Sequence, residues 1–168
     1  MTSARTWLAG LTVLALMPPA AVAQDDSNVK AVEERDGKWL TAEGIPTFKV
    51  DEDGTVDWYT FSGYRRYHSE CHVCHGPDGQ GSTYAPAIAE SAVRMDYYDF
   101  IDVVVNGRQR GNSVMPGFGT NLNVMCYLDD IYIYLTAVGT GTIPRGRPAK
   151  RADKPEAYAE AENACMGS

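Results

Sequence analysis

The sequence predicts an all-α domain, because two stretches repeat apolar residues at helical spacing and a third carries a motif that fits one helical turn. In residues 97–105 apolar side chains recur at positions i, i+3, i+4, i+7 and i+8. Asp96 can cap this helix, and Asn106-Gly107 can end it. In residues 121–139 a second stripe runs from Val124 to Val138. We therefore expect three main helices, over residues 57–74, 96–106 and 121–139.

The first expected helix, residues 57–74, contains a glycine at a position that matters for packing. Gly63 and Tyr67 are four residues apart, so they lie on one face of that helix. Because glycine has no side chain, a second helix can approach closely there. We expect the stripe of residues 121–139 to pack on this face.

The end of the first helix carries Cys71-His72-Val73-Cys74-His75, a C-x-x-C-H motif typical of covalent haem c attachment. Residues i, i+3 and i+4 share one helical face, so two thiols can bond the porphyrin vinyl groups while His75 reaches the iron. A redox-active C-x-x-C and half of a zinc site are the alternatives. Zinc needs a second pair of ligands and a thioredoxin-like site needs a βαβ setting, and the sequence offers neither. The motif predicts one covalent haem c.

Residues 1–23 have the pattern of a cleavable signal peptide. Arg5 precedes an apolar run from Trp7 to Met17, and small residues stand before Gln24. The run is shorter than the roughly 20 apolar residues of a membrane-spanning helix; an uncleaved anchor is the alternative. We expect export to the periplasm and a mature chain that begins at Gln24.

The rest of the chain is long enough for one domain with appendages. We expect a loose, acidic, turn-rich N-terminal arm with one or two short strands (residues 24–56), a haem domain (residues 57–139) and a C-terminal extension (residues 140–168). The extension contains a basic run, which is either a solvated tail or a docking patch for an acidic partner. This run comprises Arg145, Arg147, Lys150 and Arg151.

The net charge of −7 at pH 7 limits the partners of this chain. An acidic surface argues against nucleic acid and against anionic lipid. It suits a protein that docks transiently on redox proteins with complementary charge. A monomer is the default expectation.

Two cysteines remain after Cys71 and Cys74 are assigned to the haem. In an oxidising compartment the even remainder, Cys126 and Cys165, most simply forms a disulfide. Two buried free thiols are the alternative. On the expected third helix Cys126 lies on the side away from the apolar stripe. The extension that carries Cys165 is therefore expected to cover that outer side.

Met115 is the best candidate for the second axial ligand of the iron. It lies 40 residues after His75, in a glycine-rich loop between two expected helices. Thioether ligation raises the reduction potential relative to two imidazoles. The other methionines considered are Met95, Met125 and Met166, the first two inside helical patterns and the third in the tail.

The other two histidines are weaker candidates as iron ligands. His72 occupies a variable position of the motif and is expected beside the haem edge. His68 precedes Cys71 by one turn and would serve as a distal ligand only in a different fold.

The order of these motifs resembles the class I cytochromes c. After the pentapeptide the chain continues with Gly76, Gly79, Gly81, Pro86 and Ile88, then Val105-Asn106-Gly107-Arg108, Met115-Pro116 and Tyr134-Leu135. The resemblance implies the class I cytochrome c fold, with three main helices around one haem. It also implies that the carbonyl of Pro86 accepts a hydrogen bond from the proximal imidazole of His75. Ala85 stands where that superfamily often has glycine.

A narrower resemblance, over most of the chain after the leader, is to four-cysteine c-type cytochromes associated with methanol metabolism. Residues 57–70, 124–127 and 162–165 carry it. It implies a periplasmic electron carrier and no enzyme, with a quinoprotein (PQQ) methanol or alcohol dehydrogenase as donor and a cytochrome or terminal oxidase as acceptor. The alternatives are a haem peroxidase or gas-binding cytochrome with a labile distal site, and a cytochrome subunit fixed to a dehydrogenase.

Overall fold

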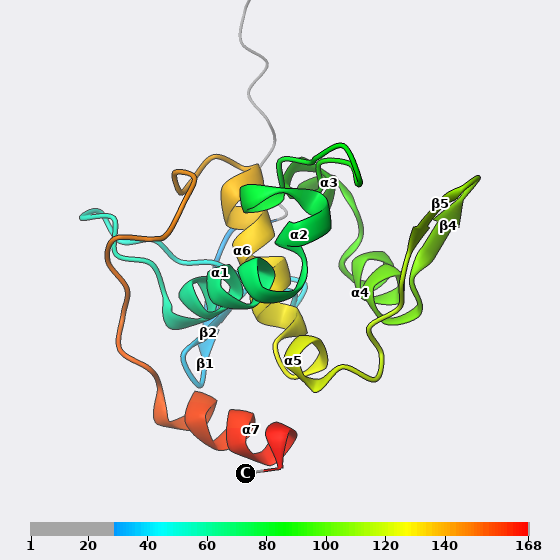
Figure 1. The fold of residues 1–168 in the computed structure, drawn as a ribbon. Coiled ribbons are helices and arrows are strands. Elements are labelled where there is room, and N and C mark those ends of the chain that lie inside the picture. Colours follow the sequence, from blue (N-terminus) through cyan, green and yellow to red (C-terminus); the bar gives the residue numbers. More distant parts are fainter. Residues whose placement is uncertain (1–28, 168) are drawn as a thin grey trace, which may run out of the picture.

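The computed structural model describes residues 29–167, so the expected signal peptide lies outside the described residues. Its helices are α1 (Trp58–Glu70), α2 (His72–His75), α3 (Ala89–Arg94), α4 (Tyr97–Asn106), α5 (Leu122–Met125), α6 (Leu128–Gly139) and α7 (Glu156–Met166), with a 3-10 turn η2 (Pro77–Gly79) after α2. Its strands are β1 (Glu33–Arg35), β2 (Lys38–Leu40), β3 (Pro46–Thr47), β4 (Arg108–Arg110) and β5 (Ser113–Met115). Figure 1 shows the helices gathered around α6.

The expectation of an all-α chain with three main helices describes only part of this architecture. β1, β2 and β3 form an antiparallel sheet in the N-terminal arm, and β4 and β5 form a separate hairpin before Met115. The arm is not loose, because Leu40, Thr47 and Phe48 are buried and β3 lies against α6. Short strands of two or three residues give little periodic signal in a sequence.

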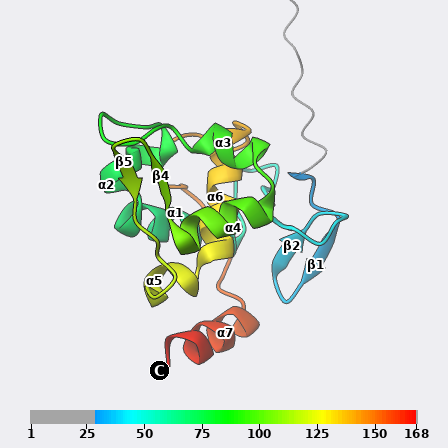
Figure 2. The same ribbon diagram turned by 90° about the vertical axis from the view of Figure 1, so that its right-hand side faces the viewer.

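Helix α6 is the centre of the fold. It buries ten of its twelve residues, so it is covered all round rather than along a single stripe. α1 and α3 make its most extensive helix contacts, and α4 also touches it (Figure 2). The side expected to face the C-terminal extension, at Ile133 and Ala137, is fully buried. β3 of the arm also packs against α6, so the C-terminal extension is not the only segment that covers this helix.

The crossing of α1 and α6 depends on Gly63, as the sequence indicates. A Cβ atom at this position would lie 1.8 Å from the carbonyl oxygen of Asp130 and 2.7 Å from Cβ of Tyr134. The two backbones can therefore approach this closely only with glycine on α1. Asp57 begins α1, and its side chain accepts a hydrogen bond from the backbone N–H of Thr60 at 2.9 Å.

The expected helix over residues 121–139 is broken into α5 and α6. Asn121 caps α5, and Cys126 ends it. Tyr127, with φ −133° and ψ 22°, then interrupts the helical backbone before α6 begins. The apolar stripe continues across the break, since Val124 and Leu128 are both buried.

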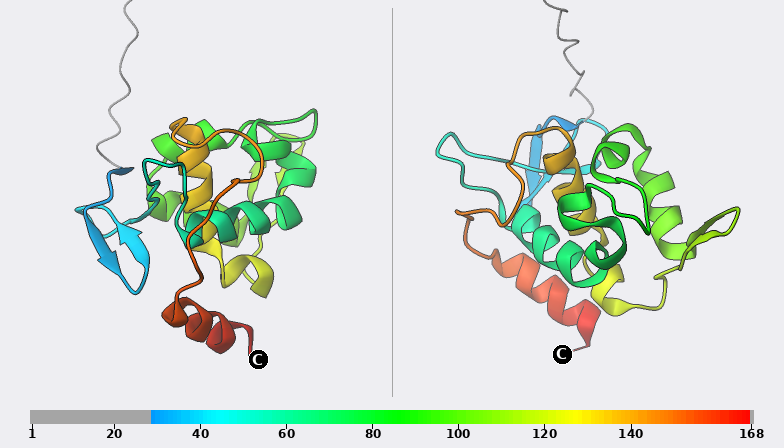
Figure 3. Two further views of the ribbon diagram at one scale, coloured as in Figure 1. Left: turned by 90° about the vertical axis from the view of Figure 1, so that its left-hand side faces the viewer. Right: turned by 45° about the horizontal axis from the view of Figure 1, so that its top comes forward.

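The C-terminal extension returns along α1 and ends in α7 (Figure 3). Ile143 is buried at its start, and the guanidinium of Arg151 lies 4.7 Å from the ring centre of Trp58. Cys126 and Cys165 form a disulfide, which confirms the predicted pairing and ties α7 to the end of α5. A disulfide of this sequence separation, 39 residues, typically stabilises a fold by about 2–4 kcal/mol.

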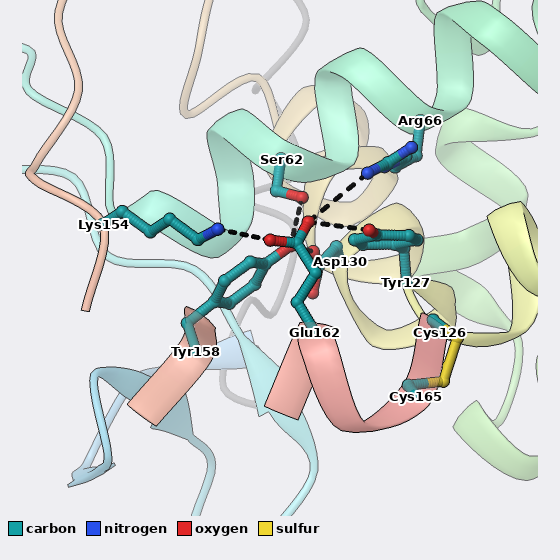
Figure 4. Close-up of polar contacts among 9 residues, drawn as sticks. All are labelled: Ser62, Arg66, Cys126, Tyr127, Asp130, Lys154, Tyr158, Glu162 and Cys165. Atoms are coloured by element: carbon teal, nitrogen blue, oxygen red, sulfur yellow. Dashed lines mark hydrogen bonds and ion pairs between the residues drawn. A yellow bond between two sulfur atoms is a disulfide. The ribbon is translucent and has the colours of Figure 1, made fainter. Parts of the chain in front are cut away.

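Polar side chains also fix α7 to the helical core (Figure 4). The hydroxyl of Tyr158 donates to Oδ2 of Asp130 at 2.7 Å and lies 2.6 Å from Oγ of Ser62. One turn further on, Glu162 accepts a hydrogen bond from the hydroxyl of Tyr127 at 2.7 Å. Glu162 also forms ion pairs with Arg66, at 3.5 Å, and with Lys154.

Burial raises the pKa of Asp130 from 3.8 to about 7, although hydrogen bonds from Ser62 and Tyr158 lower it in part. Between about pH 4 and pH 7 the folded protein therefore holds a proton on Asp130 that the unfolded chain has released. The folded state binds more protons in this window, so this group's contribution to stability falls as the pH rises. The fall is on the order of 2–4 kcal/mol.

Asp130→Asn should remove this pH dependence while keeping a partner for Tyr158. We expect the free energy of unfolding, measured by urea denaturation at pH 4.5 and 7.5, to fall less between the two values in the variant than in the wild type. Asp153→Asn, at an exposed position, controls for the loss of one negative charge. Equal falls in wild type and Asp130→Asn would mean that Asp130 is already ionised in the folded protein at the lower pH.

Candidate functional site

One ring nitrogen of His75 forms a hydrogen bond within the protein. It is 8% exposed, and its Nδ1 lies 2.9 Å from the carbonyl oxygen of Pro86. A carbonyl can only accept, so Nδ1 carries the proton and donates it in this bond. Nε2 is then the basic nitrogen that is left to bind a metal.

The chain after His75 folds so that Pro86 returns to the imidazole. Gly76 has φ +72°, and a Cβ there would lie 2.2 Å from the carbonyl oxygen of Gly81. Gly81 has φ +86°, and its Cβ would lie 2.7 Å from the backbone nitrogen of Ala87. Only glycine fits both conditions, a positive φ and this close approach of backbone. The two glycines therefore close the loop that carries Pro86.

The two thiols of the motif are free and lie within one turn of backbone. Cys71 ends α1 and precedes α2, and its carbonyl accepts hydrogen bonds from the backbone N–H groups of Cys74, at 3.2 Å, and His75, at 3.0 Å. Cys71 is half-buried and Cys74 is exposed. Burial raises the pKa of the Cys71 thiol to about 12.

Met115 ends strand β5, on a segment that α4 holds in place. Gly107 ends α4 with φ +78°, and a Cβ there would lie 2.5 Å from the carbonyl oxygen of Met115. Beyond Met115, the backbone N–H of Phe118 donates to the carbonyl of Val104 at 2.9 Å. Met115 is half-buried and packs against the core. In Figure 1, α2 lies near the middle of the molecule, and α4 with the β4–β5 hairpin lies to its right.

The other methionines within residues 29–167 have structural positions. Met95 caps the C-terminus of α3. Met125 ends α5 and lines a cavity beneath α7 together with Cys126. Met166 is the last residue of α7. None of these positions is in the β4–β5 segment beside α4.

His68 and His72 also have partners within the protein. Nδ1 of His68 lies 2.8 Å from the carbonyl of Tyr64, and Nε2 lies 3.4 Å from Oδ1 of Asp78. His72 is exposed, and its ring stacks on that of His68 at 5.6 Å between centres. Both nitrogens of His68 are thus engaged away from the β5 segment.

Three residues behind the motif were not singled out as site residues from the sequence. The hydroxyl of Tyr67 donates to the carbonyl of Gly76 at 2.6 Å, and that of Tyr134 donates to Oδ1 of the buried Asp78 at 2.7 Å. Asp78 has φ +55°, a left-handed conformation. These bonds fasten the turn after His75 to α1 and α6. The spacing of Gly63 and Tyr67 marked the first of these residues in the sequence, and the class I resemblance included Tyr134. No sequence signal marked Asp78.

The residues fit a covalent haem. Two free thiols three positions apart precede an imidazole whose Nε2 is left to bind iron, and a thioether is held on a separate segment. Large apolar side chains in the same segments are at least half exposed, and a porphyrin would cover apolar surface of this kind. They are Val73 and Tyr84. Among the described residues, no cluster of three or more His, Cys, Asp or Glu side chains could hold a free metal ion.

Comparisons with known proteins agree with this site. Residues 61–135 match the family model described as cytochrome c oxidase, cbb3-type, subunit III. The chain is 61% identical over 134 residues to cytochrome c-553I of Paracoccus denitrificans, covering 77% of this chain and 59% of that protein. It is 34% identical over 112 residues to cytochrome c-555 of Methylococcus capsulatus, covering 66% and 85% of the two chains.

A solved structure is also similar. The crystal structure of the c-type cytochrome XoxG from Methylobacterium extorquens AM1 matches with a TM-score of 0.81 and 49% identity, over 88% of this chain and 94% of that one.

The fold and the site define a protein that binds haem covalently. The chain belongs to the c-type cytochromes, in class I, and carries one covalently attached haem c. It spans 59% of the length of the Paracoccus relative. Within residues 29–167, none of the helices combines the length and the apolar character needed to cross a membrane.

Proposed function

We propose that this cytochrome transfers single electrons in the periplasm, from a quinoprotein (PQQ) methanol or alcohol dehydrogenase to a second cytochrome or a terminal oxidase. Haem c supplies the one-electron couple. Cys71 and Cys74 bind it covalently, His75 and Met115 occupy the two axial positions, and Pro86 orients His75. The domain boundaries of the sequence analysis and the leader over residues 1–23 belong to the same proposal.

The hydrogen bond from Nδ1 of His75 to the carbonyl of Pro86, at 2.9 Å, is the observation that carries this proposal. It fixes the tautomer and the orientation of the imidazole. With a thioether at the sixth position, no site is left for substrate, and this favours electron transfer over a peroxidase or a gas-binding cytochrome. The burial of Tyr67 and Tyr134 behind the motif supports a rigid proximal side.

The choice of donor is supported by the resemblance to four-cysteine cytochromes of methanol metabolism. The disulfide that uses the second pair of cysteines agrees with that subgroup and with an oxidising compartment. A cytochrome subunit fixed to a dehydrogenase is the other candidate, since the basic run of the extension offers exposed charge at Arg145 and Arg147.

Stopped-flow mixing of the oxidised holoprotein with a reduced PQQ methanol dehydrogenase tests the donor. Fast, saturable and salt-sensitive reduction of the haem bands is the expected result. Sluggish reduction, in a sample that a chemical reductant still reduces fully, would remove this donor and keep the carrier. Co-elution of the two proteins in size-exclusion chromatography would instead favour the fixed subunit.

A further inference from the structure

The β4–β5 hairpin presents two arginines on the same face as Met115. The strands pair antiparallel in the register Arg108↔Met115, Gln109↔Val114 and Arg110↔Ser113. Residues directly opposite one another share a face of the hairpin, and successive residues on a strand alternate between faces. Arg108 and Arg110 therefore lie on the face of Met115, whereas Gln109 and Val114 lie on the other face.

The root of the hairpin is fixed, so this face has a defined direction. Close backbone contacts hold the chain on both sides of Met115. A Cβ on Gly107 would lie 2.5 Å from the carbonyl oxygen of Met115, and one on Gly117 would lie 2.6 Å from the carbonyl oxygen of Val105. The hairpin cannot rotate about its axis without breaking these contacts. Arg108 and Arg110 therefore project from the hairpin on the same side as Met115.

The two arginines lack acidic partners in the protein itself. Both are exposed, and within residues 29–167 no carboxylate lies within 4.0 Å of either guanidinium. Arg35, Arg66, Arg94 and Arg145 have acidic partners, whereas Arg65, Arg147 and Arg151 have none in the described part of the chain. Arg108 and Arg110 are therefore distinguished by their place beside Met115 rather than by the lack of a partner. A haem c brings two carboxylates of its own, the propionates.

We propose that Arg108, with Arg110 beside it, binds a haem propionate and thereby raises the reduction potential. The proposal rests on the proposed ligation by Met115, because that ligation places the haem against this face of the hairpin. Cβ atoms of directly opposite residues are about 4.5–5.5 Å apart, so Arg108 starts beside the Met115 side chain. Its longer side chain can extend past the thioether to the rim of the porphyrin.

The chemistry of a guanidinium suits this role. It stays protonated at all relevant pH values and can bind a carboxylate through two parallel hydrogen bonds. Reduction adds one electron to the haem and no proton, as long as the propionate stays ionised. A fixed positive charge nearby stabilises the reduced form more than the oxidised form. It also keeps the propionate ionised at lower pH.

Spectroelectrochemical titration of the Arg108→Gln holoprotein between pH 5 and pH 9 tests the proposal. The equilibrium constant for reduction at pH 7 should fall by between about threefold and tenfold, the Coulomb effect of one charge roughly 10 Å away in partly solvated protein. The potential of the variant should also become pH-dependent in the acidic range, where the propionate now takes up a proton.

The hairpin supplies its own control. Arg108→Gln combined with Gln109→Arg keeps the net charge and moves it by one residue to the opposite face. The double variant should show the same fall as Arg108→Gln. Arg108→Lys keeps the charge on the original face and should retain most of the wild-type potential. Arg94→Gln, at an exposed pair with Glu90 on α3, controls for a distant arginine.

Restoration of the potential by the double variant would overturn the proposal, because net charge alone would then explain the effect. An unchanged potential in Arg108→Gln would also overturn it; if the salt dependence of electron transfer fell at the same time, the arginines would belong to a docking surface. Failure of the proposed ligation is distinguished by the wild-type spectrum, since the signature of thioether ligation would then be missing before any arginine is replaced. If Arg108→Gln fails to incorporate haem, Arg110→Gln gives the same test with a smaller expected effect.

Discussion

Replacing Met115 with alanine should open the sixth position of the iron and lower the reduction potential. The alanine side chain at the end of β5 is too short to bind the iron. The close backbone contacts of Gly107 and Gly117 prevent the backbone from moving toward the haem to compensate. Loss of a thioether favours the oxidised iron, so we expect a fall of more than about 0.1 V, within the roughly 0.8 V that axial ligands span in haem proteins. The reduced variant should also bind carbon monoxide.

Two other methionines provide matched controls. Met125→Ala removes a thioether from the cavity beneath α7, and Met95→Ala removes one from the end of α3. Neither variant should bind carbon monoxide. Redox titration and carbon monoxide binding, measured on all three variants, separate a ligand from a packed side chain. An unchanged potential in Met115→Ala, with no carbon monoxide binding, would mean that Met115 is not the ligand.

The parts of this fold that local signals determine were predictable from the sequence. Helix α4 begins and ends where its apolar spacing, Asp96 and Gly107 indicate, and the side chain of Asp96 accepts hydrogen bonds from the backbone N–H groups of Tyr98 and Asp99. The haem motif forms a single helical turn, with Cys71 as the N-cap of α2, as its spacing requires. The disulfide followed from counting cysteines, because only two remained in an oxidising compartment.

Features that depend on distant parts of the chain were not predictable. Asp129 and Asp130 stand in the first turn of α6, where acidic residues are normally exposed and favourable to the helix dipole. Asp130 is instead buried, because Tyr158 of α7, 28 residues later in the chain, packs against it and donates a hydrogen bond to it. Helix α7 itself has the polar sequence EAYAEAENACM, and its packing depends on the disulfide and on Tyr158 rather than on an apolar stripe.

The hairpin before Met115 was predicted only as a glycine-rich loop. Its strands have three residues each, and Arg-Gln-Arg is not a typical strand sequence. The turn at Gly111-Asn112 and the contacts at Gly107 produce the pairing. The position of Met115 was therefore visible in the sequence, while the shared face with Arg108 required the structure.

Gly63→Ala, which adds one methyl group to α1, should lower the stability of the protein more than the addition of a methyl group anywhere else on this helix. The most extensive helix contact of the fold is the α1–α6 crossing, and a Cβ on residue 63 would lie 1.8 Å from a backbone oxygen of α6. No side-chain rotation can relieve an overlap between a Cβ and a backbone atom. The helices must separate, which opens gaps beside the fully buried Tyr67 and Tyr134.

Two opposing effects decide the sign of the change. Alanine improves the helix propensity of α1 by about 1 kcal/mol relative to glycine. Overpacking in a rigid crossing costs about 3 kcal/mol or more. The net free energy of unfolding should therefore fall by at least about 2 kcal/mol, as measured by urea denaturation of the holoprotein at pH 7.

Ser69→Ala, on the exposed side of the same helix, should change stability by no more than about 0.5 kcal/mol. The haem spectrum gives a second measure, because Tyr67 fastens Gly76 and Tyr134 fastens Asp78 in the turn that follows His75. If the helices separate, these hydrogen bonds weaken and the proximal imidazole loses its fixed orientation, so the potential should shift together with the stability. A Gly63→Ala protein as stable as the wild type would show that α1 and α6 do not cross at this position. The hydrogen bonds of Tyr67 and Tyr134 to the loop after His75 would then also need a different structural explanation.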